Sequence, residues 1–482
     1  MAQDKTRNIP TVDYKKDPDY INVVKFIETG NFDGARETVK KRLDKDPFSL
    51  IWTNLLVDVH FNLDQLLQFS KNMRKQGKAE NKPELLLLSA LAAKELHQNK
   101  KAIADLKKAI KMRSDIYTLH FIMGVLYLNE NRFDSSIEHL QKALDISPEK
   151  ADPHWMLSLI HKEKDEVEMA KKEGERALEL EPDNSDALAV LGMILSEEDK
   201  IDEARKYCEK SLECDPENPL AYIAMGNLNG MQDEMESARE NLLKACELDP
   251  RNPDARYFLS LVFLKEGKLD LALENAKKAV QLDPKNPGAH YTMGAIYTGK
   301  GMFNEAVNQY QKAINIDPDK AEYHFTLGEA YLGLSLTGKA EIEYRKAIKM
   351  DPEYGDPHLS LGVVYKLRGL LDEACDEFEK AIELEPDNAE FLGVMGVLLF
   401  ETGYFNKAKE YFDRVVEIEP DDPEIHFNLG EYYLNTGKKE EAYWEYKKCL
   451  QLNPEHSEAE EKVKRLKAFI PGDIRNNLQE NE

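Results

Sequence analysis

The chain has 482 residues, and its 90 acidic residues outnumber its 65 basic residues to give a formal net charge of −25. Such an excess of negative charge repels the phosphates of nucleic acids and anionic lipid head groups, so neither is an expected partner. No segment approaches the roughly 18 consecutive apolar residues of a membrane span, and no apolar stretch follows the charged N-terminus. The sequence therefore predicts a cytoplasmic protein without membrane insertion.

Residues 1–15 are polar and are expected to be disordered. Farther along, the chain has a fixed period of 34 residues, marked by Pro148, Pro182, Pro216, Pro250, Pro284, Pro318, Pro352, Pro386, Pro420 and Pro454. A period of this length indicates one supersecondary unit that is repeated and stacked, so that each copy contacts only its neighbours. We number each repeat so that the periodic proline is position 32.

Each repeat is predicted to contain two amphipathic helices, because apolar residues recur at spacings of three and four on both sides of a central turn. Position 8 is usually glycine and position 20 is usually alanine, as at Gly294 and Ala306. These small residues allow the two helices to approach at the short end of the usual ~8–10 Å range. Pairs such as Asn286-Pro287 combine an N-capping side chain with a proline suited to a first helical turn, and they mark where repeats begin.

In chain order, residues 16–82 are predicted to form two degenerate repeats, the second with Gln68 where the small alanine is expected. Residues 83–456 form eleven 34-residue repeats. Residues 457–470 are predicted to form one amphipathic helix that caps the array, starting with a capping-box pattern from Ser457 to Glu460. The polar tail at residues 471–482 is expected to be disordered.

The residues at positions 7, 8, 11, 20, 24, 27 and 32, at this period, resemble the tetratricopeptide repeat. The match is close over residues 117–456 and weaker before them. The resemblance implies an all-α fold: a right-handed α-solenoid (superhelix) of about 13 helix-turn-helix repeats with a C-terminal capping helix. It also implies that the first helix of every repeat lines a concave wall, whose usual role is to hold a peptide or protein partner.

The resemblance places positions 2, 5, 9, 12 and 13 on the concave wall, and positions 5 and 9 carry an apolar stripe with a few polar residues. The candidate partner-binding residues are Phe121, Trp155, Ile223, Asn227, Tyr257, Leu261, Tyr291, Phe325, Glu329, Leu359, Phe427 and Glu431. One interpretation is that the stripe packs against the next repeat as core. The other is that it stays exposed as a groove, with Tyr257, Tyr291 and Phe325 as anchors for an amphipathic helix or an extended peptide.

Other specialised sites are not expected. The chaperone carboxylate clamp known in related repeats needs a lysine at position 5, which none of the ten clear repeats has. Six histidines share position 4, but equivalent positions are too far apart to bind one metal ion, so we assign them to packing. The stretch from Gly333 to Lys339 resembles a phosphate-binding loop, yet Ala340 replaces the required hydroxyl residue and the stretch falls in an inter-helix turn. No cofactor, no metal and no catalytic activity are therefore expected.

The sequence favours a non-catalytic protein–protein interaction scaffold that binds a peptide or protein segment in an apolar concave groove. One alternative is a regulatory or substrate-delivering subunit of an enzyme or assembly machine on a separate chain, such as a glycosyltransferase, a secretion apparatus or an envelope-assembly apparatus. A second alternative is a structural protein that associates with itself. The sequence does not identify the partner.

Overall fold

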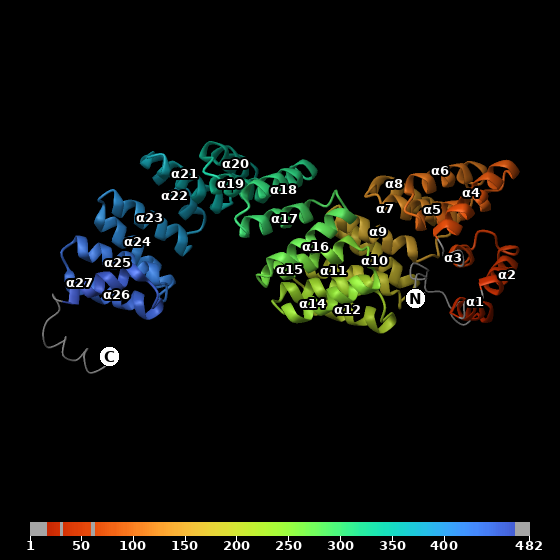
Figure 1. Ribbon diagram of the computed structural model, residues 1–482, viewed down its shortest axis with the longest axis horizontal. Helices are drawn as coiled ribbons and strands as arrows, with labels where there is room; N and C mark the ends of the chain where they lie inside the picture. The colour runs from red at the N-terminus through yellow and green to blue at the C-terminus, as the bar shows by residue number, and fades with distance from the viewer. Residues whose placement is uncertain (1–16, 29–31, 59–62, 468–482) are drawn as a thin grey trace. The chain divides into compact units, whose positions relative to one another are not determined.

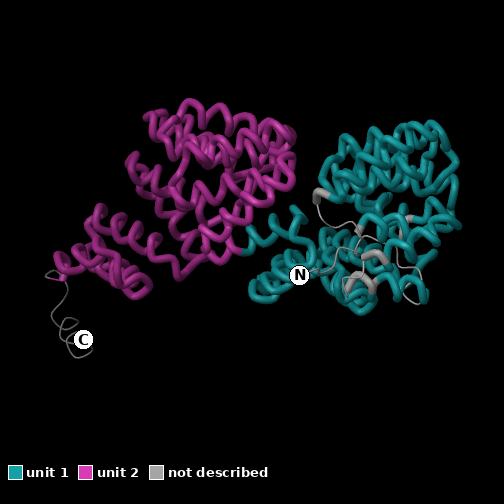
Figure 2. Tube along the Cα trace, turned by 45° about the vertical axis from the view of Figure 1, so that its right-hand side comes forward, with its two compact units in different colours: residues 1–262 teal, residues 263–482 magenta. Residues whose placement is uncertain are grey.

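The computed structural model describes residues 17–28, 32–58 and 63–467, and these residues contain 27 helices (Figure 1). The chain divides into two compact units, residues 1–262 and 263–482 (Figure 2), and each unit is considered by itself. The tails expected at residues 1–15 and 471–482 lie outside the described residues. The predicted all-α helical-repeat fold is confirmed.

The helices of the first unit form consecutive helix-turn-helix pairs. They are α1 (Pro18–Glu28), α2 (Phe32–Leu43), α3 (Leu50–Asp58), α4 (Leu63–Glu80), α5 (Pro83–Glu95), α6 (Asn99–Met112), α7 (Tyr117–Leu128), α8 (Phe133–Ile146), α9 (Asp152–Glu163), α10 (Val167–Leu180), α11 (Ser185–Glu197), α12 (Ile201–Cys214), α13 (Pro219–Met231), α14 (Met235–Leu248) and α15 (Pro253–Lys265), which ends just past the division.

The second unit continues the same pattern and ends with a single helix. Its helices are α16 (Leu269–Leu282), α17 (Pro287–Gly299), α18 (Phe303–Ile316), α19 (Ala321–Gly333), α20 (Thr337–Met350), α21 (Gly355–Leu367), α22 (Leu371–Leu384), α23 (Ala389–Glu401), α24 (Phe405–Ile418), α25 (Pro423–Asn435), α26 (Lys439–Leu452) and α27 (Ser457–Leu466). Odd numbers from α1 to α25 are the first helices of their pairs, and even numbers are the second helices.

Side-chain caps start several first helices at the predicted places. The Oδ1 atom of Asn218 accepts a hydrogen bond from the backbone N–H of Leu220 at 2.8 Å, and a carboxylate oxygen of Asp422 accepts one from the N–H of Glu424 at 2.9 Å. Each cap satisfies a backbone donor that has no partner within the helix. The capping role predicted for the Asn-Pro and Asp-Pro pairs is confirmed at these two positions.

Where position 8 is glycine, that glycine allows close contact between the two helices of a pair. A Cβ atom at Gly294 would lie 2.5 Å from the ring of Tyr310, and one at Gly362 would lie 2.4 Å from the ring of Phe378. Both rings are at position 24 of the same repeat and are buried. Any side chain at position 8 would therefore push the second helix away, which confirms the packing role predicted for these glycines.

Histidine at position 4 joins the two helices of a pair by a buried polar contact. The Nδ1 atom of His324 lies 2.6 Å from a carboxylate oxygen of Glu343, and His358 makes the same 2.6 Å contact with Glu377. Equivalent contacts are made by His154 with Glu173, His290 with Gln309, and His426 with Glu445. These partners account for the repeated histidines as packing residues rather than as metal ligands.

The first helices of neighbouring pairs also lie against one another. In the first unit α11 contacts both α9 and α13, and in the second unit α17 contacts α19 and α23 contacts α25. Among the described residues, no two second helices make comparable contact. Each unit therefore has its first helices on the inner side of the stack and its second helices on the outer side.

Two details differ from the sequence-based expectations. Gln68 is exposed, and the small residues that pack α4 against α5 are Ser70, which hydrogen bonds with Ser89, and Gly77, whose Cβ would lie 3.0 Å from Leu86. At the start of α27, His456 rather than Ser457 is the N-cap, because its Nδ1 atom accepts from the N–H of Ala459 at 3.2 Å. The capping contact of α27 with the preceding pair is present nonetheless, through buried Val463 and Leu466.

Candidate protein-binding surface

The twelve candidate residues lie on first helices, and they differ in how far they are buried. Phe121, Ile223 and Leu359 are buried, which favours the core-packing interpretation for these three. The other nine are half-buried, and part of each side chain can be reached from solvent. A partner-binding role for any of the twelve remains a prediction.

The half-buried aromatic residues at position 5 also contact side chains far from them in the sequence. The ring of Tyr291 stacks on that of Tyr323 at 5.1 Å, and its hydroxyl donates to Glu322 at 2.6 Å. The ring of Phe325 meets Tyr354 edge-on at 5.3 Å. The expected three-residue anchor also includes Tyr257, which belongs to the first unit while the other two belong to the second, so the anchor as a whole remains a prediction.

The two glutamates at position 9 interact with side chains of neighbouring helices. Glu329 accepts a hydrogen bond from the hydroxyl of Tyr344 at 2.5 Å and another from the hydroxyl of Ser360 at 2.8 Å. Glu431 accepts from the hydroxyl of Tyr446 at 2.6 Å and forms an ion pair with Lys462 of α27. These contacts hold both carboxylates in fixed positions on the first-helix side.

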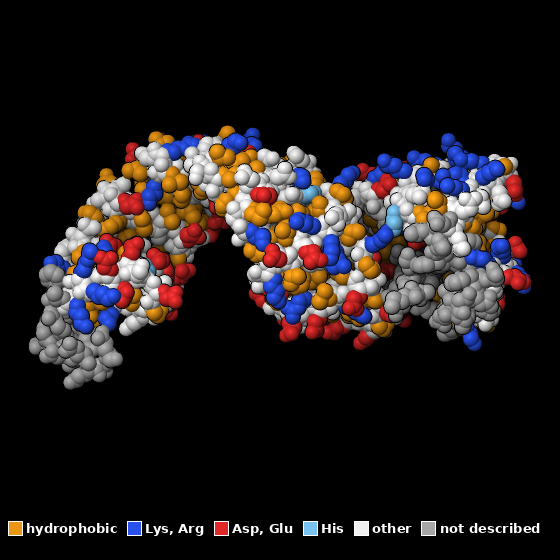
Figure 3. Space-filling view, viewed as in Figure 1, with side chains coloured by type: hydrophobic (Ala, Val, Ile, Leu, Met, Phe, Trp, Pro, Cys, Tyr) orange, Lys and Arg blue, Asp and Glu red, His pale blue; other side chains and the backbone are white. Residues whose placement is uncertain are grey.

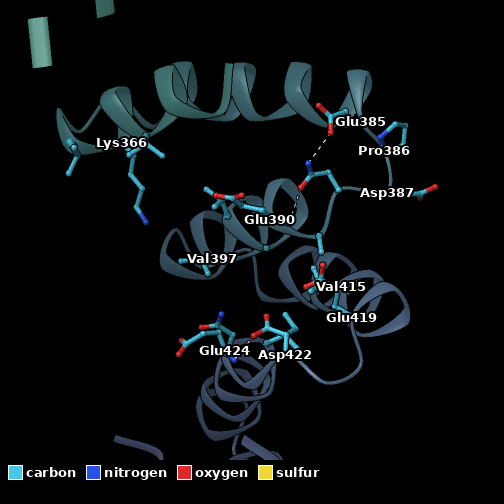
Figure 4. A pocket seen from close by; sticks show the side chains of 18 residues that line it. Lys366, Glu385, Pro386, Asp387, Glu390, Val397, Val415, Glu419, Asp422 and Glu424 are labelled. Atoms are coloured by element: carbon cyan, nitrogen blue, oxygen red, sulfur yellow. Dashed lines mark hydrogen bonds between the residues drawn. The ribbon is translucent and has the colours of Figure 1, made fainter. Parts of the chain in front are cut away.

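A groove of about 1260 Å³ lies over α21, α23 and α25 of the second unit (Figure 4). Its apolar lining includes Val363 on α21 and Val394 and Val397 on α23. The lining also includes Gly393, a glycine at position 5 of α23. A Cβ atom added there would have no heavy atom of another part of the chain within 4 Å.

The rim of this groove is strongly acidic. The acidic lining residues come from the connections that precede α23 and α25 and from the first turns of these two helices, and they are Glu385, Asp387, Glu390, Glu419, Asp422 and Glu424. Lys366 is the one basic residue in the described lining, and its ammonium group lies 2.8 Å from Glu401. Figure 3 shows hydrophobic side chains over this part of the second unit bordered by acidic ones.

Acidic residues at position 2 face other carboxylates in both units. Burial, and next the nearby Glu181 and Asp186, raise the pKa of Asp152 to about 7, against a smaller lowering effect of Lys150. In the second unit burial raises the pKa of Asp356, as do Glu385 and Glu329. In each unit, therefore, burial and neighbouring carboxylates disfavour the charged form of an acidic residue at position 2.

Sequence reasoning missed the groove. The glycine at position 5 was visible, but an isolated glycine in a helical pattern does not reveal whether it is needed for packing or leaves open space. The acidic residues were also visible, but they are spread over three repeats. Only the stacking of α21, α23 and α25 brings them to the rim of one groove.

Within the described residues, no group of three or more histidine, cysteine, aspartate or glutamate side chains is placed to hold a metal ion. The phosphate-loop-like stretch joins the end of α19 at Gly333 to α20, which begins at Thr337, so it is a turn between two helices. None of the described helices combines the length and apolar character needed to cross a bilayer.

An all-α array of stacked helix pairs defines the chain as a helical-repeat protein. Family models described as "Tetratricopeptide repeat" match residues 87–151, 151–184, 174–206, 321–354, 368–426 and 411–443, and one described as "TPR repeat" matches residues 261–301 and 294–335. The chain therefore belongs to the tetratricopeptide-repeat family. Proteins built of this repeat are generally non-catalytic interaction scaffolds that bind proteins or peptides, and this general role is the one that the family supports here.

The same all-α fold is found in a solved structure. The APC/C hetero-tetramer Cut9–Hcn1 matches with 16% identity and a TM-score of 0.56, over 94% of this chain and 97% of that one. A tetratricopeptide repeat protein from Parabacteroides merdae matches with 22% identity and a TM-score of 0.44, over 52% of this chain and 98% of that one. MamA matches with 26% identity and a TM-score of 0.31, over 34% of this chain and 95% of that one. No protein with curated function matches.

Proposed function

We propose that this chain is a non-catalytic, cytoplasmic scaffold that holds a peptide or protein segment against the first helices, with the groove over α21, α23 and α25 as its main contact surface. The observation that carries the proposal is the groove itself. It is about 1260 Å³ in volume, which is ample for several side chains of a partner. Its apolar lining would lose contact with water when a partner binds, and that loss of apolar surface favours association.

The half-buried rings at position 5 support the same proposal. Phe325 on α19 and Phe427 on α25 are each held on one side by neighbouring rings, at 5.3 Å from Tyr354 and 4.7 Å from His456. Their conformations are therefore largely fixed before a partner arrives. A fixed aromatic surface loses little conformational entropy on binding, which is typical of residues that dominate protein interfaces.

Photo-cross-linking in source-cell lysate tests this proposal. A photoreactive phenylalanine analogue replaces either Leu367, which lines the groove and is 65% exposed, or Ile342, which is on the second helix α20 and is 55% exposed. The two sites are matched in chemistry and exposure. We expect a defined protein to be captured at Leu367 and not at Ile342, and equal capture at both sites, or capture at Ile342 alone, would contradict the proposal.

The captured protein also decides between the scaffold and the alternatives. A set of different protein segments would support the scaffold. A single enzyme recovered in a fixed ratio to this chain would support a regulatory or substrate-delivering subunit instead. Capture of the chain by itself, with a mass in solution that rises with concentration, would support self-association.

A further inference from the structure

We propose that the segment held in this groove is a basic peptide that inserts one large apolar side chain, aromatic or leucine, into the space beside Gly393. This inference rests on the proposed function and adds the chemistry of the partner. Two independent observations support it. The first is a space beside Gly393 that the other repeats of the second unit fill with their own position 5 side chain. The second is the negative charge of the residues around that space.

The repeats that include α19 and α25 show what the space accommodates. In each of them the position 5 ring packs between the ring at position 24 and the residue at position 34. Phe325 lies 6.0 Å from Tyr344 and 5.3 Å from Tyr354. Phe427 lies 5.6 Å from Tyr446 and 4.7 Å from His456. In the α23 repeat the equivalent residues are Gly393, Phe412 and Asp422, so the position 5 ring is missing and a partner can supply it.

The packing of α23 does not require glycine at position 393. One turn later, at Gly396, a Cβ atom would lie 2.6 Å from Phe412, so glycine is needed there to let the second helix approach. At Gly393 the space around the missing Cβ is open. A glycine inside a helix costs about 0.5–1 kcal/mol relative to alanine. Because no contact within the protein accounts for this cost, we assign the space to a ligand.

The charge around the space selects a basic partner. The carboxylates of Glu390 and Glu419 form no ion pair among the described residues. The two rim contacts with basic groups are long, 4.0 Å from Asp387 to Arg414 and 3.5 Å from Glu424 to His456 Nε2. Lysine or arginine side chains beside the inserted apolar group would meet these carboxylates, and the opposite charges would favour the approach and orientation of a basic segment.

The same charge argues against other occupants. An acidic segment would place like charges together at the rim and would be repelled. A second copy of this chain carries a net charge of −25 and would meet the same repulsion. A purely apolar segment would fill the space beside Gly393 and leave the rim carboxylates without partners.

Selection from a displayed library of random peptides, with the full chain as bait, tests the inference without assuming a partner. Two variants are carried through in parallel: Gly393→Leu, which fills the space, and the double variant Glu390→Lys, Glu419→Lys, which reverses charge at the rim. Leu359 occupies the same position on α21, so we expect Gly393→Leu to fold, and circular dichroism and thermal melting verify this for both variants.

We expect the selected peptides to contain one large apolar residue flanked by lysine or arginine, and to be lost on both variants. In fluorescence anisotropy, a selected peptide should bind Gly393→Leu at least about tenfold more weakly than the wild type. Replacing the apolar residue of the peptide by alanine should weaken binding to the wild type and have little further effect on Gly393→Leu. That non-additivity shows that the two side chains compete for one space.

The possible outcomes separate this inference from the proposed function. Selected peptides that are acidic or neutral, or that bind Gly393→Leu as tightly as the wild type, would overturn the inference while leaving a peptide-binding scaffold in place. Basic peptides that depend on the rim charges but not on Gly393 would also overturn it, because they would indicate attraction without insertion. If no peptide were enriched above background and cross-linking at Leu367 captured nothing, both proposals would fail.

Discussion

At the scale of single residues, two glycines of α23 differ in whether the surrounding structure leaves room for a side chain. Gly396 faces Phe412 at a distance that excludes a Cβ, whereas Gly393 faces open space. We expect Gly393→Ala to stabilise the protein by about 0.5–1 kcal/mol, because alanine loses less conformational entropy in a helix. We expect Gly396→Ala to destabilise it by about 1–3 kcal/mol, because the added methyl group overpacks the contact. Urea unfolding measures both, and a stability change of the same sign in the two variants would contradict this account of the groove.

Asp152 provides a residue-scale prediction of pH dependence in the first unit. Burial is the main reason that its pKa is raised from 3.8 to about 7. Between these two pH values the folded protein retains a proton that the unfolded chain releases, so the free energy of unfolding falls as pH rises from about 4 to about 7. We expect this decrease to be at least about 1 kcal/mol, and Asp152→Asn to reduce it because the amide does not titrate.

The measurement uses the fluorescence of Trp155, which is three residues from Asp152, in a background where the other two tryptophans, Trp52 and Trp444, are replaced by phenylalanine. Urea unfolding is followed at several pH values for this background protein and for its Asp152→Asn variant. Parallel dependence on pH in the two proteins would show that Asp152 does not retain a proton in the folded state.

At the scale of elements, the contact of His358 with Glu377 holds α21 to α22. Gln309 occupies the equivalent place opposite His290, at 2.8 Å, so an amide is an acceptable partner. We therefore expect Glu377→Gln to be nearly neutral. Glu377→Ala should cost about 1–3 kcal/mol, because it leaves a buried histidine nitrogen without its partner. Thermal and urea unfolding of the two variants measure the difference, and equal effects would contradict the role given to this contact.

The C-terminal helix α27 provides a second prediction at this scale. It buries Ala459, Val463 and Leu466 against Tyr446 and Cys449 of α26. Because each repeat is stabilised mainly by its neighbours, a chain that stops after His456 should lose stability locally. We expect faster hydrogen exchange in α25 and α26 and unchanged exchange in α7 and α8. Unchanged exchange in α26 would show that α27 does not cap the array.

Sequence predicted these elements well because their ends depend on local chemistry. An asparagine or aspartate before the proline that opens a repeat caps the first helix, as Asn218 and Asp422 do, and a glycine at position 8 requires a close helix contact wherever it occurs. Exposure at position 5 was not predictable, because it depends on residues far along the chain, such as the residue at position 34. Phe325 remains half-buried beside Tyr354, whereas Leu359 at the same position is buried. The groove was missed for the same reason, since it is the absence of a side chain at Gly393 that opens it.

At the scale of the whole molecule, part of the acidic excess behind the net charge of −25 is gathered at one surface, which composition does not reveal. In the second unit acidic residues gather around the groove on the first-helix side. A partner that binds there through basic residues exchanges its contacts with water and counterions for ion pairs with the protein. We expect its affinity to fall as ionic strength rises, measured by anisotropy from low to physiological salt, and an affinity independent of salt would contradict a basic partner.

The most direct test of the central claim is hydrogen exchange followed by mass spectrometry, on the full chain with and without the protein captured at Leu367. Binding along the first helices predicts slower exchange in α21, α23 and α25 when the partner is present, and little change in α20, α22 and α24. Protection confined to α20, α22 and α24 would place the partner on the outer side and contradict the account.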